Sequence, residues 1–358
     1  MTEQSGPSEQ TVATDPPVRI GIVGTSWIAA AFVEAARTVD GIEITAVCSR
    51  TAASADRFAD RLGIPRRYTD LAALGEAADV DGVYIASPNS EHAPQAIALL
   101  EAGKHVLVEK PIAISAAQAE AMIEAARTAD RVLMEAYVTP YEPNVAAIRA
   151  ALPQLGRLRR AVLMKSQYSS KYDALKGGEL PNAFNPEFGG GALMDLGFYQ
   201  AALAVHLFGE PASVVATGQL LDSGVDGQAT FVLGYDGFEV IAIQSKVAPT
   251  ALGSEIAGED GVLSFDDSSV PSSVRLAFRK GAPGEATAPG FTRPPEGVAA
   301  ELAPGQSEHH MRYEAEEFAR LIREGGRESR LHPTLASLAT LRILDAAREQ
   351  VGVRFPGA

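Results

Sequence analysis

Cysteine, tryptophan and long apolar runs are scarce in this sequence. Its 358 residues include one cysteine, Cys48, which excludes an intramolecular disulfide framework and favours a reducing compartment, with the cytoplasm as the default. No stretch reaches the roughly eighteen consecutive apolar residues of a transmembrane helix. The first residues contain neither lysine nor arginine and match no secretory signal. We therefore expect residues 1–16 to form a disordered leader.

Basic residues are fewer than acidic ones. Lysine and arginine number 31 against 45 acidic residues, so the formal net charge is −14. Nucleic acids and anionic membranes bind basic faces, so neither is an expected partner, and a small-molecule substrate remains. Two adjacent histidines, His309 and His310, lack a third ligand at suitable spacing, so we predict no metal site. The chain length and a 46% hydrophobic content favour two globular domains.

Strand-like and helix-like segments alternate from residue 18 onward. Strand-like segments are predicted over 18–24, 42–50, 81–89, 105–111 and 131–137, with helical spacing between them. Such alternation predicts a parallel, doubly wound sheet of the Rossmann kind, whose ligands lie at the carboxyl ends of the strands. We assign residues 17–138 to this NAD(P)-binding domain.

The turn after the first strand reads "GIVGTSWIA" and fits the dinucleotide fingerprint with one change. Gly24 takes the place of the tight turn, Ser26 stands where a second glycine usually lies, and Ala29 takes the helix-packing place. Backbone N–H groups at the start of the following helix would bind phosphates. The predicted cofactor contacts here are Gly24, Thr25, Ser26, Trp27 and Ile28. The alternative interpretation is an ordinary strand-to-helix turn.

The end of the second strand bears on the choice of dinucleotide. An NAD site usually places an acidic residue there, but this chain reads "CSRT". Arg50 offers planar charge to a 2′-phosphate, and Ser49 offers a hydrogen bond. NADP is therefore favoured over NAD, against the alternative of an exposed arginine without a ligand.

The next two strand ends complete the predicted cofactor side. The fourth strand, "HVLVEKPI", begins as buried core and ends in charge, which indicates that its lysine projects into the crevice, aimed by the proline turn. The predicted contacts from these two strand ends are Ser87, Pro88, Asn89, His92, Glu109 and Lys110.

The second half contains strand-like segments over 159–169, 212–221, 227–236, 238–247 and 254–267, and amphipathic helices over 312–326 and 333–352. A sheet domain over residues 139–358 is therefore predicted. Between its strands, an apolar helix over 193–209 places Asp195 and Tyr199 four residues apart, on one face. A buried tyrosine satisfied by an aspartate is an equally good interpretation of that pair taken alone.

Three segments together, "GTSWIA", "SPNSEHAPQAIALLEAGKHVLVEKP" and "GGGALMDLGFY", resemble the Gfo/Idh/MocA oxidoreductases, in their dihydrodiol and NADP-type xylose dehydrogenase branch. The resemblance spans about residues 18–356. It implies a Rossmann domain followed by a large, open, mainly antiparallel sheet, and assembly into a homodimer or homotetramer. It also implies that Lys110 is catalytic and that the helix carrying Asp195 and Tyr199 faces the nicotinamide. Ser26 departs from the family's customary glycine.

These observations predict a catalytic group of Lys110, Asp195 and Tyr199. A free tyrosine is a poor base near neutrality, so we expect Lys110 to lower the pKa of Tyr199 while Asp195 orients the pair. Tyr199 would transfer the proton and Lys110 would act electrostatically, or these two roles are exchanged. Tyr168 and Lys171 are predicted to contact the substrate.

The predicted function is NADP(H)-dependent hydride transfer to or from a secondary alcohol or ketone of a sugar, polyol or cyclic diol. Two alternatives remain at this stage. A non-redox enzyme could use bound nicotinamide transiently, as some glycosidases similar to this family do, and would show no net change in NADPH. A non-catalytic dinucleotide sensor would be favoured if Lys110 and Tyr199 were dispensable.

Overall fold

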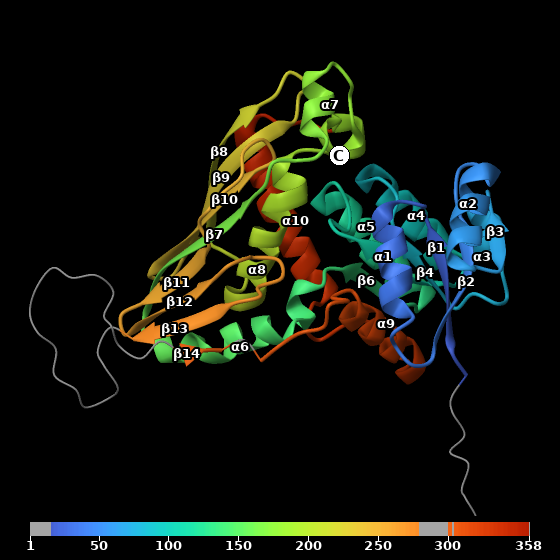
Figure 1. Cartoon of the computed structure of the whole chain (residues 1–358), viewed down its shortest axis with the longest axis horizontal. Helices are drawn as coiled ribbons and strands as arrows, with labels where there is room; N and C mark the ends of the chain where they lie inside the picture. The colour runs from blue at the N-terminus through green and yellow to red at the C-terminus, as the bar shows by residue number, and fades with distance from the viewer. Residues whose placement is uncertain (1–15, 279–299, 303, 358) are drawn as a thin grey trace, which may run out of the picture.

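The computed structural model describes residues 16–278, 300–302 and 304–357. The predicted leader, 1–16, lies outside the described residues except for Pro16. Two sheets face each other across a layer of helices, with the nucleotide-binding sheet on one side and the larger sheet on the other (Figure 1).

The first sheet has six parallel strands in the order β3-β2-β1-β4-β5-β6. Its apolar runs are buried on both faces, as at Val106, Leu107 and Val108, which are fully inaccessible. The prediction of a doubly wound parallel sheet is therefore confirmed. Its strands are β1 (Val18–Val23), β2 (Ile42–Cys48), β3 (Arg66–Tyr68), β4 (Gly82–Ile85), β5 (His105–Glu109) and β6 (Leu133–Ala136). Its helices are α1 (Trp27–Ala36), α2 (Ala52–Leu62), α3 (Leu71–Gly75), α4 (Asn89–Glu101) and α5 (Ala116–Ala129).

The second sheet has eight described strands in the order β14-β13-β12-β11-β7-β10-β9-β8. Neighbouring strands run antiparallel except β7 and β10, which pair in parallel, so the predicted mainly antiparallel sheet is confirmed. The strands are β7 (Leu158–Ser166), β8 (Ser213–Leu220), β9 (Asp226–Tyr235), β10 (Phe238–Ser245), β11 (Ser254–Gly258), β12 (Gly261–Phe265), β13 (Val274–Phe278) and β14 (Ala300–Glu301). The accompanying helices are α6 (Pro143–Ala151), α7 (Tyr172–Lys176), α8 (Phe198–Phe208), α9 (Arg312–Glu324) and α10 (Thr334–Val351), with a π-helix, η5 (Leu193–Gly197), just before α8.

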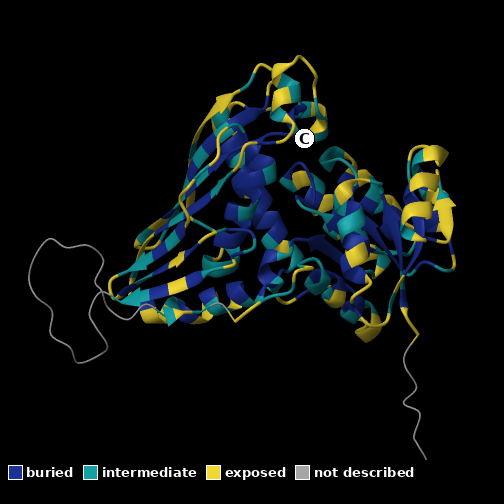
Figure 2. Ribbon diagram, in the orientation of Figure 1, coloured by how far each residue is buried: buried dark blue, intermediate teal, exposed yellow. Residues whose placement is uncertain are grey.

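Among the described residues, helices cover one face of the large sheet. Leu163, Phe231 and Ala242 are fully buried on the face that packs against η5, α8 and α10, and buried and accessible segments both appear along the strands (Figure 2). Alternate residues of the same strands point away from the helices. This alternation of buried and accessible positions is typical of an antiparallel sheet with one solvated face.

The apolar segment Pro186–Phe208 is long and apolar enough to cross a membrane by length and composition alone. In the fold, 72% of its apolar window is buried inside the protein. It packs between the large sheet and α10, which identifies it as a core helix.

The last two helices return to the first domain. Phe318 of α9 is fully buried in one core with Phe32 of α1 and Ile20 of β1, although α9 falls in the range 139–358 predicted for the sheet domain. Chain order alone does not indicate this return, because α9 shows only a generic amphipathic pattern.

A buried polar cluster joins α10 to the nucleotide-binding sheet. Glu135 of β6 accepts hydrogen bonds from His332 Nε2 at 2.8 Å and from Ser337 Oγ at 2.7 Å. Its other oxygen accepts from the backbone N–H of Ile112 at 2.6 Å. All three side chains are at most 3% exposed. One carboxylate therefore holds α10 and the turn that follows β5.

Replacing Glu135 tests this connection. Glu135→Leu leaves three buried donors without an acceptor and should lower the free energy of unfolding by about 3–5 kcal/mol, the scale for breaking a buried charged pair. Urea denaturation would measure the change. Glu124→Leu is the matched control, because Glu124 is exposed on α5 and its partners among the described residues are Arg127 and Thr128 of the same helix, and it should change stability little. Equal effects of the two substitutions would contradict the account.

Candidate active site

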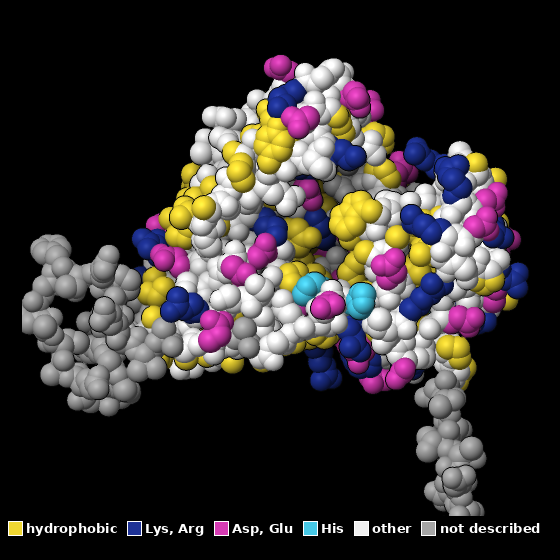
Figure 3. Space-filling view, in the orientation of Figure 1, with side chains coloured by type: hydrophobic (Ala, Val, Ile, Leu, Met, Phe, Trp, Pro, Cys, Tyr) yellow, Lys and Arg dark blue, Asp and Glu magenta, His cyan; other side chains and the backbone are white. Residues whose placement is uncertain are grey.

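The predicted cofactor residues follow neighbouring strands of the first sheet. Gly24 comes directly after β1, Ser49 after β2, Ser87 shortly after β4 and Lys110 after β5. These four strands are adjacent, in the order β2-β1-β4-β5, so their carboxyl ends form one continuous edge. The space-filling view is hollowed between the two domains (Figure 3).

The turn after β1 requires a glycine and leaves the start of α1 open. Gly24 has φ +103°, and a Cβ there would lie 2.6 Å from the carbonyl oxygen of Ala86, so no other residue fits without movement. Ser26 caps α1, its Oγ accepting from the N–H of Ala29 at 3.5 Å. Trp27 is 78% exposed, and the first turn of α1 contains no acidic residue. These features fit a phosphate group at the helix N-terminus.

Arg50, just after β2, is the predicted binding residue for the 2′-phosphate. Arg50 is exposed, and no hydrogen bond or ion pair joins it to any other residue that the structure describes. The neighbouring Thr51 is occupied, since its hydroxyl caps α2 by accepting from the N–H of Ser54. The guanidinium of Arg50 is therefore available for a phosphate, as a 2′-phosphate site requires.

Two predicted cofactor contacts are engaged within the protein instead. His92 is fully buried, with Nδ1 2.9 Å from the Pro111 carbonyl oxygen and Nε2 3.0 Å from the Ser87 carbonyl oxygen. Glu109 accepts a hydrogen bond from the hydroxyl of Tyr84, and burial raises its pKa to about 7. Both side chains hold the strand-end turns in place and do not reach into the crevice, which corrects the expectation of direct contact.

Ser87, Pro88 and Asn89 are the other predicted cofactor contacts beyond β4. Ser87 Oγ donates to Gln95 Oε1 at 2.8 Å, and Asn89 Nδ2 donates to the carbonyl oxygen of Gly189 at 3.0 Å. Pro88 precedes α4 in an extended conformation. Asn89 thereby links the cofactor edge to the loop that leads into η5.

Lys110 meets Asp195 across the two domains. Its Nζ donates to Asp195 Oδ1 at 2.9 Å and to the backbone carbonyl of Asp195 at 3.1 Å. The opposite carboxylate oxygen, Oδ2, accepts from Lys246 Nζ at 2.7 Å. We call Lys110, Asp195 and Lys246 the lysine–aspartate cluster. The carboxylate is thus shared between two ammonium groups.

Tyr199 lies beside this cluster. Lys110 Nζ is 4.4 Å from the centre of the Tyr199 ring, within the range of a cation–π contact. Lys165 Nζ lies 5.6 Å from the same ring and forms an ion pair with Asp267 at 2.6 Å. Tyr137 packs against Tyr199 at 6.1 Å between ring centres. The structure therefore brings the three predicted catalytic residues together.

Burial and charge set the protonation of the three groups. Burial opposes ionisation of Asp195, but Lys110 and Lys246 outweigh it and hold the pKa of its carboxyl far below the ordinary value. Burial likewise opposes the charge on Lys110, but Asp195 and Tyr199 raise the pKa of its ammonium above the ordinary value. Asp195 is ionised and Lys110 protonated at neutral pH.

The pKa of Tyr199 differs from the sequence-based expectation. Burial raises the pKa of its phenol above the ordinary value of 10.0, and Lys110 only partly offsets that effect. The expected net lowering by the lysine is therefore wrong for this structure, because desolvation outweighs the neighbouring charge. Tyr199 holds its proton at neutral pH.

The helical segment that carries Asp195 is itself anchored. It is a π-helix, a form common at functional sites. At its start, Asp226 of β9 accepts from the backbone N–H of Leu193 at 2.8 Å, and burial raises the pKa of Asp226 to about 6. The four-residue spacing of Asp195 and Tyr199 therefore spans a junction of π-helix and α-helix.

The predicted substrate residues lie on the segment after β7. The Tyr168 hydroxyl donates to Asp173 Oδ1 and accepts from Lys176 Nζ, both at 2.7 Å. Lys171 is exposed and precedes α7. Contact of both residues with the substrate stays a prediction.

Lys165 and Lys246 were missed by the sequence interpretation. Each stands at the end of an apolar strand, the same signal that drew attention to Lys110. The parallel pairing of β7 with β10 sets Lys165 opposite Gln244 and leaves Lys246 one residue beyond the sheet. Only that pairing reveals that both lysines approach the same site. Among the described residues, no group of three His, Cys, Asp or Glu side chains could hold a metal ion.

Comparison with known families gives two matches along the chain. Residues 18–137 match the family described as "Oxidoreductase family, NAD-binding Rossmann fold". Residues 149–264 match the "GFO/IDH/MocA C-terminal domain". The matched regions correspond to the two sheets.

Two relatives and one solved structure extend over nearly the whole chain. The scyllo-inositol 2-dehydrogenase (NADP(+)) IolU of Bacillus subtilis is 39% identical, covering 95% of this chain and 98% of its own. The trans-1,2-dihydrobenzene-1,2-diol dehydrogenase of Danio rerio is 31% identical over 94% and 98%. A 3-ketoreductase from Actinomadura kijaniata, solved with NADP, has a TM-score of 0.79 at 24% identity, covering 95% of this chain and 100% of its own. These likenesses show that the chain belongs to the Gfo/Idh/MocA oxidoreductase family.

Proposed function

We propose that this chain is an NADP(H)-dependent oxidoreductase that transfers a hydride between nicotinamide and a secondary alcohol or ketone of a sugar, polyol or cyclic diol. The observation that carries the proposal is the meeting of Lys110 from the first domain with Asp195 and Tyr199 from the second. The Bacillus subtilis relative makes scyllo-inositol the first substrate to test, and the Danio rerio relative makes trans-1,2-dihydrobenzene-1,2-diol the second.

The cofactor site uses the carboxyl edge of the first sheet. Residues 24–28 would bind the pyrophosphate with backbone N–H groups at the start of α1, and Ser49 and Arg50 would bind the 2′-phosphate. His92 and Glu109 act indirectly, by fixing the turns after β4 and β5. When bound, the nicotinamide supplies or accepts the hydride.

The side chains of this site donate or accept the proton that accompanies hydride transfer. Reduction of a ketone places negative charge on its oxygen, and Lys110 and Tyr199 both face that crevice in protonated form. We assign proton donation to Tyr199 and charge stabilisation to Lys110, with Asp195 holding the ammonium in place. Oxidation of an alcohol runs the same steps in reverse and requires Tyr199 to lose its proton first. Tyr168 and Lys171 would contact the distal part of the substrate.

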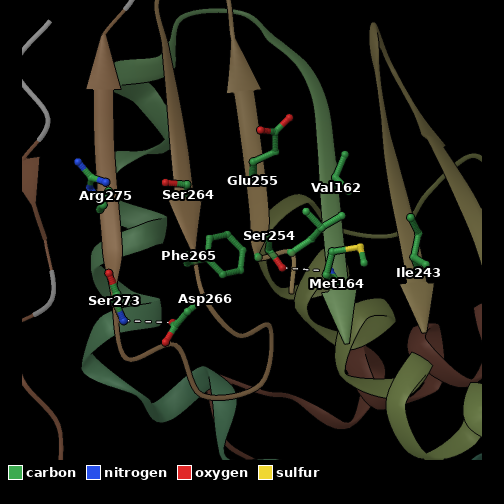
Figure 4. Close-up of a pocket in the computed structure, with 12 residues that line it drawn as sticks. Val162, Met164, Ile243, Ser254, Glu255, Ser264, Phe265, Asp266, Ser273 and Arg275 are labelled. Carbon is green, nitrogen blue, oxygen red and sulfur yellow. Dashed lines mark hydrogen bonds between the residues drawn. The ribbon is translucent and has the colours of Figure 1, made fainter. Parts of the chain in front are cut away.

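The open face of the large sheet supports a homodimeric or homotetrameric assembly. Val215, Val232, Ile241 and Val162 form a row across four adjacent strands on the side away from the helices, and Val215 is 63% exposed. A hollow of about 500 Å³ lies on this face, where Met164, Ile243 and Val162 line it (Figure 4). A second copy of the sheet is the occupant that we propose, because an uncovered apolar face favours burial. A cytoplasmic location fits the single cysteine, which is buried.

Cofactor choice is tested at Arg50. Arg50→Ala should weaken NADPH binding by about 1.5–3 kcal/mol, the scale of a charged hydrogen bond, and leave NADH binding nearly unchanged. Trp27 is the only tryptophan and begins α1, so its fluorescence reports binding directly. Arg61→Ala, on the exposed side of α2, is the control. Equal losses for both cofactors would contradict the assignment.

The catalytic roles are tested by Tyr199→Phe and Lys110→Ala. Each should lower kcat by roughly 10²–10⁴, because a proton-transfer group or its electrostatic partner is removed. The affinity for NADPH should be nearly intact in both variants. Tyr235→Phe is the control, since the Tyr235 hydroxyl donates to the Gly209 carbonyl at 2.9 Å in the sheet domain, outside the lysine–aspartate cluster. Turnover by both site variants within about threefold of wild type would favour the sensor alternative.

The direction of the Tyr199 pKa shift predicts opposite pH dependences for the two reactions. A raised pKa keeps the phenol protonated across the neutral range, so kcat/KM for ketone reduction should be flat there and fall only as pH rises through that pKa. Alcohol oxidation requires the deprotonated form, so its kcat/KM should rise with pH, by about tenfold per unit at most. Initial rates of NADPH loss and formation would measure both. An oxidation optimum at or below neutrality would refute this assignment.

A further inference from the structure

Lys246 is fixed in place by hydrogen bonds of its backbone and by burial of its side chain. It directly follows β10, and its backbone N–H donates to the Gly227 carbonyl at 2.9 Å, while its carbonyl accepts from the N–H of Ser169 at 2.8 Å. The side chain is 3% exposed. Its Nζ lies 5.2 Å from the centre of the Phe184 ring. Lys246 therefore cannot swing out to a substrate.

Lys110 and Lys246 differ in what they can reach. The Lys110 side chain is 14% exposed and Asp195 is 38% exposed, so both border the crevice. Lys246 touches the site only through Asp195 Oδ2. Any effect of Lys246 on the reaction must pass through that carboxylate.

The lysine–aspartate cluster holds two ammonium groups on one carboxylate. Two further carboxyl groups act on it from outside, Asp226 on Lys246 and Glu109 on Lys110. Because Lys110 alone among the described residues joins Asp195 to the first domain, the ion pair between the domains does not require Lys246. The charge of Lys246 instead offsets part of the negative charge of Asp195.

We propose that Lys246 is a positioning residue that engages the second oxygen of Asp195 and thereby offsets part of the negative charge of that carboxylate beside the nicotinamide. The inference rests on the proposed function, since it requires the nicotinamide to lie beside Lys110. The oxidised ring carries a positive charge and the reduced ring does not. Lys246 thus weakens binding of NADP⁺ relative to NADPH and biases the site toward the reduced cofactor.

Other charged groups face the same region and are common to every variant compared below. Lys165 and Asp267 form an ion pair and contribute no net charge. Burial raises the pKa of Glu109 to about 7 and the pKa of Asp226, which interacts with Lys246, to about 6. All titrations are therefore run at one pH well above both values, where both carboxyl groups stay ionised in every variant and the comparison isolates the charge on Lys246.

Calorimetric titration of the full chain with NADP⁺ and with NADPH tests the proposal without relying on turnover. Lys246→Gln keeps a hydrogen-bond donor for Asp195 and removes the charge. It should lower the ratio Kd(NADP⁺)/Kd(NADPH) by about three- to tenfold, as expected for one charge acting through a partly solvated site. Lys246→Arg restores the charge and should return the ratio to about the wild-type value.

A matched control is provided by Lys104 at the opposite end of β5. Its Nζ donates to the carbonyl oxygens of Ala77 at 2.6 Å and Val80 at 2.8 Å. Lys104 precedes β5, whereas Lys110 of the cluster follows it. Lys104→Gln removes a partly buried lysine of the first domain and should leave the ratio unchanged. A change in that control equal to the change in Lys246→Gln would overturn the proposal.

Asp195→Asn supplies an independent test of opposite sign. It adds one net positive charge to the cluster and should raise the ratio, so it also decides the question if Lys246→Gln does not fold. An unchanged ratio in either folded variant, or equal losses for both cofactors, would overturn the role of Lys246. Failure of the proposed function looks different, because the wild-type chain would then form no net NADPH from the alcohol substrates, whatever the ratio of its two cofactor affinities.

Discussion

The carboxylate of Asp195 is the point on which the site depends. It lies on the π-helix of the second domain and binds Lys110 from the first domain and Lys246 from the large sheet. Neither domain contains the complete group. Because the ionised Asp195 raises the pKa of Lys110, the same ion pair that joins the domains also favours the charged ammonium at the crevice. Tyr199 adds a protonated phenol beside that ammonium.

The surroundings hold Lys110 from several directions. His92 fixes the carbonyl of Pro111, and Glu135 fixes the N–H of Ile112, so the two residues after Lys110 are both bound by buried side chains. Glu135 in turn binds His332 and Ser337 next to and within α10. The last helix of the chain thus supports the turn that presents the lysine. A preorganised ammonium is worth more in a partly buried site than a mobile one in water.

Much of the fold and of the candidate site was predictable from the sequence, and the features that were not predictable depend on tertiary contacts. The parallel sheet followed from apolar runs such as 106–108, and Gly24 and Lys110 from their places after strands. Lys246 was not predictable, because its approach depends on the parallel pairing of β7 with β10, which no local pattern indicates. The roles of His92 and Glu109 were misjudged because residue type at a strand end does not reveal whether a side chain turns inward. The pKa of Tyr199 required burial to be known.

The central claim is that this interdomain site carries out net hydride transfer. Its most direct test is to incubate the wild-type chain and NADP⁺ with carbon-deuterated scyllo-inositol and trans-1,2-dihydrobenzene-1,2-diol, and to locate the deuterium by NMR. The account predicts NADPH formed in equal amount to the ketone, with deuterium from the carbinol carbon at C4 of its nicotinamide ring. NADPH free of that deuterium, or product formed without net NADPH, would contradict it.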